Sequence, residues 1–185
     1  MKAQRNTKLS KPVKIIFVVG LTILTLIFAL ALIFLIIYIF FFRPFQVIGD
    51  AMSPNFTNGQ YYWSKMQPDN LKKGDVIAFR APDNSDKVYI KRVIATSGDK
   101  VMLKNGDVYL NDQPLDESAY LDDSVKTDGG SFIKEDQTIT VHERDYFVLG
   151  DNRRYSADSR EWGFVPRKDT IGKFLFCYWN CNPSN

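Results

Sequence analysis

The sequence of 185 residues is poor in the side chains that most often bind metals or form catalytic thiol pairs. It contains one histidine, His142, and two cysteines, Cys177 and Cys181. A zinc site requires about four ligands, and a catalytic cysteine needs a base such as histidine, so this supply argues against both kinds of site. We expect no metal and no cofactor, and we expect His142 to be an ordinary surface or strand residue.

The first 42 residues contain no acidic side chain, and most of them carry no charge of either sign. Residues 1–14 hold five basic side chains and no acidic one, and residues 15–42 hold no charged side chain at all. The net charge of +3 comes entirely from the basic tail, because 19 basic and 21 acidic residues give 43–185 a net charge of −2. A folded part without a positive surplus lacks the means to neutralise phosphates, so we expect no nucleic-acid partner.

The uncharged run 15–42 is long enough to cross a lipid bilayer, which takes about 20 apolar residues. The alternatives are a buried core helix, which would be shorter, and a cleaved signal peptide, whose apolar core of about 7–15 residues would precede small residues rather than FFFRPF. The basic tail before the run, against Arg43 after it, indicates a cytoplasmic N-terminus. We expect a basic cytoplasmic tail at 1–14, a single transmembrane helix at 15–42 and an extracytoplasmic domain at 43–185.

The extracytoplasmic part has the pattern of one modest β-rich domain. No stretch beyond residue 42 keeps a helical apolar period for three turns, and the Asn-Gly pairs at 58–59 and 105–106 predict hairpin turns. Residues 112–136 are polar, acidic and turn-rich, which is typical of a solvated loop or a small cap on a sheet. We expect strands at 45–48, 61–63, 76–79, 88–94, 101–103, 108–110 and 146–149.

Lys91 is the first residue that could carry chemistry. It lies within an apolar strand, on the same face as Tyr89 and Val93. A lysine in a strand is commonly an exposed or edge residue. If this face is buried instead, desolvation would lower the pKa of Lys91 and supply an unprotonated amine as a general base.

Two further segments are polar and lie at strand ends. Residues 150–160 (GDNRRYSADSR) follow a strand. They form either a solvated loop with internal hydrogen bonds, in which Asp158 and Arg160 are a structural ion pair, or a set of hydroxyls and paired charges that orients a catalytic amine. Residues 49–54 (GDAMSP) follow the strand at 45–48 and by themselves indicate only a turn.

Together the three segments resemble bacterial type I signal peptidases, membrane-anchored serine proteases that use a Ser-Lys dyad. The family pattern Ser-Met-x-Pro corresponds to 51–54 (AMSP), and its Lys-Arg segment leading to Gly-Asp corresponds to 89–93 (YIKRV) and 98–99 (GD). The signature Gly-Asp-Asn-Arg-x-x-Ser-x-Asp-Ser-Arg matches 150–160 at every fixed position. The resemblance covers the anchor and nearly all of 43–176.

The resemblance implies a mostly antiparallel β-sheet domain of signal-peptidase type on the outer surface of the plasma membrane. Such a protein cleaves signal peptides from translocated preproteins after small residues (Ala-x-Ala type). Lys91 would deprotonate the nucleophile, the backbone N–H at position 51 would meet the oxyanion, and Ser156 would hydrogen-bond the lysine amine. The supporting residues implied are Ser156, Asp158, Arg160, Asp151 and Asn152.

The implied partners are preprotein signal peptides and the lipid bilayer; the sequence predicts no oligomeric state. We expect the substrate to bind as an extended strand beside 45–48 and the strand of Lys91, with shallow apolar pockets for small side chains. Phe45 has a second interpretation, since it could seat the domain at the headgroup layer or pack in the core. The residues assigned to substrate binding are Phe45, Val47, Gly49, Met52 and Tyr89.

The sequence departs from the family pattern at one decisive position, because Ala51 stands where the nucleophilic serine is expected. A methyl group cannot attack a carbonyl, so the mechanism lacks its first step. Three readings are open: an engineered serine-to-alanine variant, a natural non-catalytic homologue, or use of another hydroxyl, the nearest being Ser53. In an extended chain Ser53 would lie about 6.6–6.8 Å further along, beyond the hydrogen-bond reach of about 2.6–3.2 Å.

Two functions of different class follow. The chain is either a signal peptidase, active as such or after one hydroxyl is restored, or a non-hydrolytic membrane protein that binds signal peptides or a peptidase partner. Cys177 and Cys181 have two interpretations as well: a disulfide, which an extracytoplasmic location permits, or a buried strand residue and a free thiol.

Overall fold

The computed structural model describes residues 11–66, 68, 70–82 and 84–181, which divide into two compact units after Phe40. The first is helix α1, Lys11–Phe41, whose side chains are exposed throughout and whose most apolar window has a mean hydropathy of 3.1. It begins before the expected boundary because Lys11 and Lys14 continue the helix, as long cationic side chains can at a membrane interface. Most of the predicted tail, residues 1–10, lies outside the described residues.

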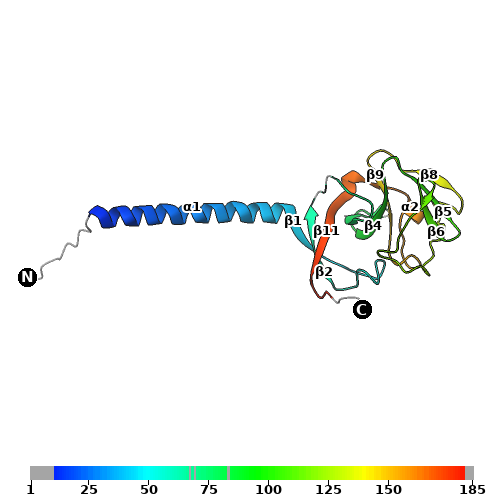
Figure 1. Cartoon of the computed structure of the whole chain (residues 1–185), viewed down its shortest axis with the longest axis horizontal. Coiled ribbons are helices and arrows are strands. Elements are labelled where there is room, and N and C mark those ends of the chain that lie inside the picture. The colour runs from blue at the N-terminus through cyan, green and yellow to red at the C-terminus, as the bar shows by residue number, and fades with distance from the viewer. Residues whose placement is uncertain (1–10, 67, 69, 83, 182–185) are drawn as a thin grey trace, which may run out of the picture. The chain divides into compact units, whose positions relative to one another are not determined.

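The second unit is mostly β, as predicted. Its described residues contain eleven strands in two sheets, all paired antiparallel, with one short α-helix and one 3₁₀ turn (Figure 1). Their bounds are β1 Phe42–Gln46, β2 Tyr61–Met66, β3 Val76–Arg80, β4 Val88–Thr96, β5 Lys100–Lys104, β6 Asp107–Leu110, β7 Gln113–Pro114, β8 Thr138–Thr140, β9 Asp145–Leu149, α2 Ser159–Trp162, β10 Val165–Pro166, η1 Arg167–Asp169 and β11 Thr170–Trp179.

The larger sheet has seven strands in the order β1-β2-β11-β3-β4-β9-β10, so β1 is an edge strand. Strand β4 pairs with β3 along Val88–Arg92 but with β9 only from Arg92 onward. Residues 88–91 therefore have a strand on one edge and, within the described part of the chain, none on the other. Two strand edges, that of β1 and that of the first half of β4, are thus available on one sheet.

The smaller sheet, β7-β6-β5-β8, contains the hairpin that the Asn-Gly pair at 105–106 predicted. Asn105 and Gly106 both adopt positive φ, 54° and 80°, as a two-residue turn of type I′ requires. Figure 1 places β5, β6 and β8 on one side of the domain and β1, β2 and β11 on the other, with β4 and β9 between them.

Two local predictions were wrong. The strand expected at 45–48 is instead β1, Phe42–Gln46, so Val47 and Ile48 follow the strand. The Asn-Gly pair at 58–59 does not close a two-residue hairpin, because 47–60 form a longer connection between β1 and β2. Its ends are joined by the bonds from Val47 N–H to Gln60 O and from Gly59 N–H to Val47 O, 2.8 and 2.9 Å.

The insertion at 112–136 is a cap that contributes to the core. Ile133 is fully buried in the cluster under the smaller sheet, and Thr127 is also buried. The carboxylate of Glu117 pairs with the buried Arg153 at 2.5 Å. Most acidic residues of this segment are exposed, whereas a few of its other residues are buried against the rest of the domain.

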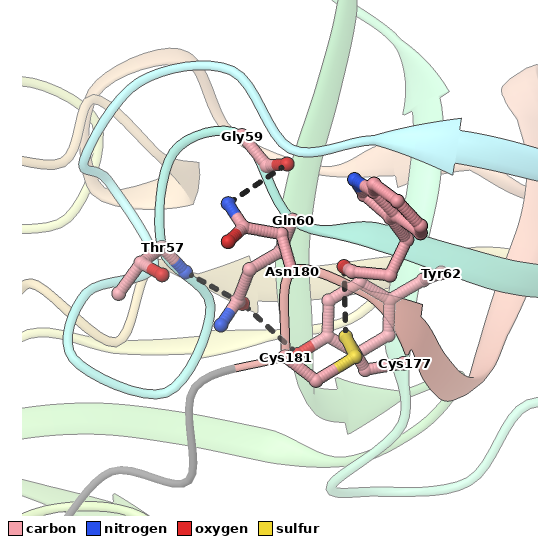
Figure 2. Close-up of a disulfide and its surroundings, with 8 residues drawn as sticks. Thr57, Gly59, Gln60, Tyr62, Cys177, Asn180 and Cys181 are labelled. Carbon is pink, nitrogen blue, oxygen red and sulfur yellow. Dashed lines mark hydrogen bonds between the residues drawn. A yellow bond between two sulfur atoms is a disulfide. The ribbon is translucent and has the colours of Figure 1, made fainter.

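Cys177 and Cys181 form a disulfide with a Cα–Cα distance of 5.8 Å at the end of β11 (Figure 2). Beside it, Asn180 donates a hydrogen bond from Nδ2 to the Gly59 carbonyl, 3.4 Å, and so links the end of β11 to the connection between β1 and β2. Of the two interpretations of this cysteine pair, the disulfide is the one that the structure has.

Candidate active site

Lys91 is buried in the first half of β4, with 4% of its surface exposed. Its Nζ lies 5.7 Å from the ring centroid of Tyr89. Burial lowers the pKa of Lys91 from 10.5 to about 8, because desolvation penalises the ammonium more than the nearby Asp158 and Asp151 stabilise it; Arg160 lowers the pKa further. A substantial fraction of the amine is then neutral near physiological pH, which a general base requires.

The loop after β9 is held by the ion pair that the sequence suggested. Arg160 Nε lies 2.8 Å from Asp158 Oδ1, and both residues are buried. The other carboxylate oxygen, Oδ2, accepts the N–H of Gly150 at 3.1 Å. Arg160 also donates to the carbonyls of Arg153 and Ser156, at 2.6 and 3.2 Å. These bonds connect residues within the loop to one another and hold the loop at the end of β9.

Asp151 forms a second buried pair, with the residue next to the lysine. Arg92 donates from Nε and Nη2 to the two oxygens of Asp151, 2.8 and 2.5 Å, and from Nη1 to the carbonyl of Gly74, 2.9 Å. Asn55 donates to the same carboxylate at 2.9 Å and to the carbonyl of Tyr120 at 2.6 Å. Because Arg92 adjoins Lys91, this bidentate pair ties β4 to the polar loop.

The segment around position 51 is bonded to the same loop. Asn152 donates its backbone N–H to the carbonyl of Ala51, 3.1 Å, and its side-chain amide to the carbonyl of Asp50, 3.0 Å. A Cβ on Gly150 would collide with Ser156 Oγ and with the Ala51 carbonyl oxygen. Both groups therefore lie close to Gly150, and this position has no space for a side chain. The Oγ of Ser156 is buried and, within the described residues, has no hydrogen-bond partner.

Position 51 and Lys91 line one cavity of about 580 Å³. Both unpaired strand edges border it, through Pro44–Gln46 of β1 and Val88–Lys91 of β4. The floor is apolar, because Val47 and Met52 are 2% exposed in a cluster that Phe45 joins by packing on Phe174, 6.1 Å between ring centroids. All the residues that the sequence assigned to substrate binding line this cavity: Phe45, Val47, Gly49, Met52 and Tyr89.

Ser53 lies apart from this cavity. It lines a different hollow, of about 560 Å³, together with Tyr120 and residues 151–155. Its backbone N–H donates to the carbonyl of Asp50 at 3.1 Å, which makes a turn. The turn directs Ala51 and Ser53 to different hollows, whereas an extended chain would have put both side chains on one side.

Sequence reasoning missed the pair of Glu117 and Arg153. Arg153 Nη2 and Nη1 lie 2.5 and 3.0 Å from the two Glu117 oxygens, and Arg153 also contacts Thr127 Oγ1. This pair links the insertion to the loop that holds Asp151 and Asp158. The only sequence signal for this pair was Arg153, which is a fixed position of the 150–160 signature. Nothing local distinguishes Glu117 from the other acidic residues of 112–136. Within the described ranges, no group of three or more metal-ligating side chains occurs.

An apolar helix of membrane-spanning length, an antiparallel β domain and a lysine buried beside a groove are features of a membrane-anchored peptidase. The family model described as "Signal peptidase, peptidase S26" matches residues 20–179. The chain is 33% identical to signal peptidase IB of Staphylococcus aureus (strain COL), over 88% of this chain and 96% of that protein. It is 34% identical to signal peptidase I S of Bacillus subtilis (strain 168), over 80% of this chain and 83% of that protein.

Among solved structures, a signal peptidase I from Enterococcus faecalis V583 has 30% sequence identity and a TM-score of 0.47, and the match covers 58% of this chain and 98% of that one. The family-model match and the curated relatives show that the chain belongs to the signal peptidase family S26, as a bacterial type I signal peptidase.

Proposed function

We propose that this chain binds the signal peptides of translocated preproteins in the groove between β1 and β4, and that it hydrolyses them once position 51 carries a hydroxyl. The single observation that carries the proposal is that Ala51 and the buried Lys91 line the same cavity, whereas Ser53 lines another. As given, the chain then has the base of a Ser-Lys dyad without its nucleophile. Its function in this form is recognition without cleavage.

Recognition uses the two unpaired strand edges. An extended substrate can add as a strand between β1 and Val88–Lys91, with backbone hydrogen bonds supplying affinity. Val47 and Met52 are buried and line the cavity, and we infer that they form shallow apolar pockets, which suit small side chains next to the scissile bond. This geometry supports the Ala-x-Ala preference that the family resemblance implied.

The chemistry follows from the protonation state of one amine. In Ala51→Ser, neutral Lys91 would take the proton of the serine hydroxyl while Oγ attacks the carbonyl carbon, and the ammonium would then return the proton to the leaving amine. The backbone N–H of residue 51 has no partner among the described residues and is available to the oxyanion. The Oγ of Ser156 is buried beside Gly150 with no hydrogen-bond partner in the described part of the chain, and we assign this hydroxyl to orienting the amine. Asp158, Arg160, Asp151 and Asn152 hold this geometry.

The membrane arrangement belongs to the same proposal. The apolar helix α1 holds the chain in the plasma membrane, the basic tail stays in the cytoplasm, and the peptidase domain meets preproteins outside it. A disulfide between Cys177 and Cys181 suits that location, because disulfides persist in oxidising compartments.

The experiment compares cleavage by the full chain of a preprotein with Ala at −1 and −3. The variants are the chain as given, Ala51→Ser, Ser53→Ala, and Ala51→Ser combined with Lys91→Ala; the matched control for the last is Ala51→Ser with the exposed Lys100→Ala. We expect Ala51→Ser to raise cleavage by at least about a thousandfold, Lys91→Ala to remove that gain, and Lys100→Ala to leave it intact.

Two outcomes would overturn the proposal. If Ala51→Ser binds the preprotein but does not cleave it, the dyad assignment is wrong. If the chain as given cleaves and Ser53→Ala does not, Ser53 is the nucleophile and the separation of the two cavities does not hold in solution.

A further inference from the structure

A second cavity of the domain, larger than the groove, shares no lining residue with it and is lined by cations. Its volume is about 790 Å³. Among the described residues that line it there is one carboxylate, Asp145, against five cationic side chains, Arg43, Arg80, Arg144, Arg167 and Lys168. This local excess stands on a domain whose net charge is −2. We call this hollow the basic cavity.

The cations come from separate elements that meet at one end of the larger sheet. Arg43 is the second residue of β1, Arg80 ends β3, and Arg167 and Lys168 lie with Asp169 in η1 before β11. The N–H of Arg167 donates to the carbonyl of Arg144 at 2.8 Å, so a backbone bond holds two cationic residues side by side. Bringing like charges together costs free energy, which a bound anion would offset.

The lining suits an amphiphilic phosphate better than a bare ion. Four of the five cations are arginines, whose planar guanidinium matches phosphate oxygens bidentately. Met66, Pro166 and Ile171 provide apolar wall beside them. Thr170 also lines the cavity, and its hydroxyl is buried with no hydrogen-bond partner among the described residues. The volume lies within the range of about 300–1,000 Å³ that is common for small-molecule sites.

Chain connectivity limits how far this cavity can lie from the membrane surface. Arg43 directly follows Phe42, the last residue of the uncharged run, and consecutive Cα atoms lie only about 3.8 Å apart. If the run spans the bilayer, Arg43 must lie in or close to the headgroup layer. We propose that the basic cavity binds the phosphodiester headgroup of an anionic glycerophospholipid. The inference takes from the proposed function only the membrane anchor, and nothing in it depends on the peptidase chemistry.

The test measures lipid binding to the full chain in neutral detergent by native mass spectrometry, with dioleoylphosphatidylglycerol and dioleoylphosphatidylcholine as probes. The cavity variant is Arg80→Gln, Arg144→Gln, Lys168→Gln. The matched control loses the same charge elsewhere, through the exposed Lys100→Gln, Lys104→Gln, Lys134→Gln. We expect phosphatidylglycerol to bind at least tenfold more tightly than phosphatidylcholine, the cavity variant to lose that preference, and the control to keep it within twofold.

Competition with free phosphates distinguishes a lipid headgroup from a soluble phosphate as the ligand. Inorganic phosphate and glycerol 3-phosphate are titrated as competitors, and we expect neither to displace the lipid below millimolar concentration. Displacement at the lipid's own concentration would make a soluble phosphate the ligand and overturn the lipid assignment. Equal loss in both triple variants, or no preference in the chain as given, would overturn the site. If the cavity variant melts early, the single reversal Lys168→Glu on the exposed η1 turn replaces it, with Lys104→Glu as its control.

Discussion

At the scale of single residues, the central feature is a buried lysine, whose proposed role as a base comes with a cost in stability. Lys91 is 4% exposed, and burial depresses its pKa to about 8. The sequence predicted this residue as the base but left its burial open, because an alternating strand has two faces and its pattern does not say which one another segment covers. The charges that shift its pKa lie in the loop of Asp158, and Ala51 and Met52 line the same cavity; both segments are distant along the chain.

We predict that Lys91→Met stabilises the domain near neutral pH. Below pH 8 Lys91 is charged in the folded and unfolded states alike, and the depressed pKa corresponds to about 3 kcal/mol of destabilisation there. Between about pH 8 and pH 10.5 the unfolded chain binds more protons than the folded one, so the stability of the Lys91 form rises with pH and its disadvantage shrinks.

Thermal or denaturant unfolding of both forms at pH 7 and pH 10 checks this. The free energy of unfolding of Lys91→Met should exceed that of the parent by about 1–3 kcal/mol at pH 7, and by clearly less at pH 10. A variant less stable than its parent at pH 7 would mean that the ammonium is well compensated in the fold.

At the scale of elements, the groove depends on where strand pairing stops. β9 pairs with β4 only from Arg92 onward, and among the described strands β1 pairs only with β2. The sequence predicted most strands because their apolar alternation is local. It could not predict that β9 leaves 88–91 unpaired, since the pairing joins residues fifty or more positions apart in the sequence.

The two Asn-Gly pairs show the limit of a local signal. At 105–106 strand residues adjoin the pair on both sides, and a hairpin forms. At 58–59 the preceding residues 49–56 fold into turns against the loop of Asp151, through bonds such as that from Asn55 Nδ2 to Asp151 Oδ2. A tertiary contact therefore replaced the local hairpin there. That contact belongs to the site.

We predict that the groove discriminates by side-chain size at the scissile position. We propose that the chain as given binds without cleaving, so a preprotein with Phe at −1 should bind it at least tenfold more weakly than one with Ala, because we expect the pockets beside Val47 and Met52 to admit only small side chains. Equilibrium binding to the detergent-solubilised chain measures this, with Phe placed well inside the mature region as the control. Equal affinity for Ala and Phe at −1 would argue against strand addition in this groove.

At the scale of the whole molecule, the two units have separate tasks. α1 has the length and apolarity of a membrane anchor, and the β domain contains the groove and the basic cavity, whose Arg43 follows the apolar run. The apolar helix was predictable because length and the absence of charge are decided locally. The basic cavity was not, because its five cations are separated by up to 125 residues and meet only in the folded sheet.

The orientation can be tested on intact cells. We predict that external protease degrades the domain at 43–185 while an epitope tag at the N-terminus stays protected, because the five basic residues of 1–14 retain that end in the cytoplasm. Immunoblotting before and after permeabilisation checks this, and a cytoplasmic protein serves as the control for lysis. Protection of the domain together with loss of the tag would reverse the proposed topology.

The most direct test of the central claim is the pH dependence of single-turnover cleavage by Ala51→Ser. If buried Lys91 is the base, the rate rises with pH, reaches half its maximum near pH 8, and levels off above, because only the neutral amine accepts the serine proton. A rate that is half-maximal near pH 6.5, as a histidine base would give, or that has no such limb, would contradict the account.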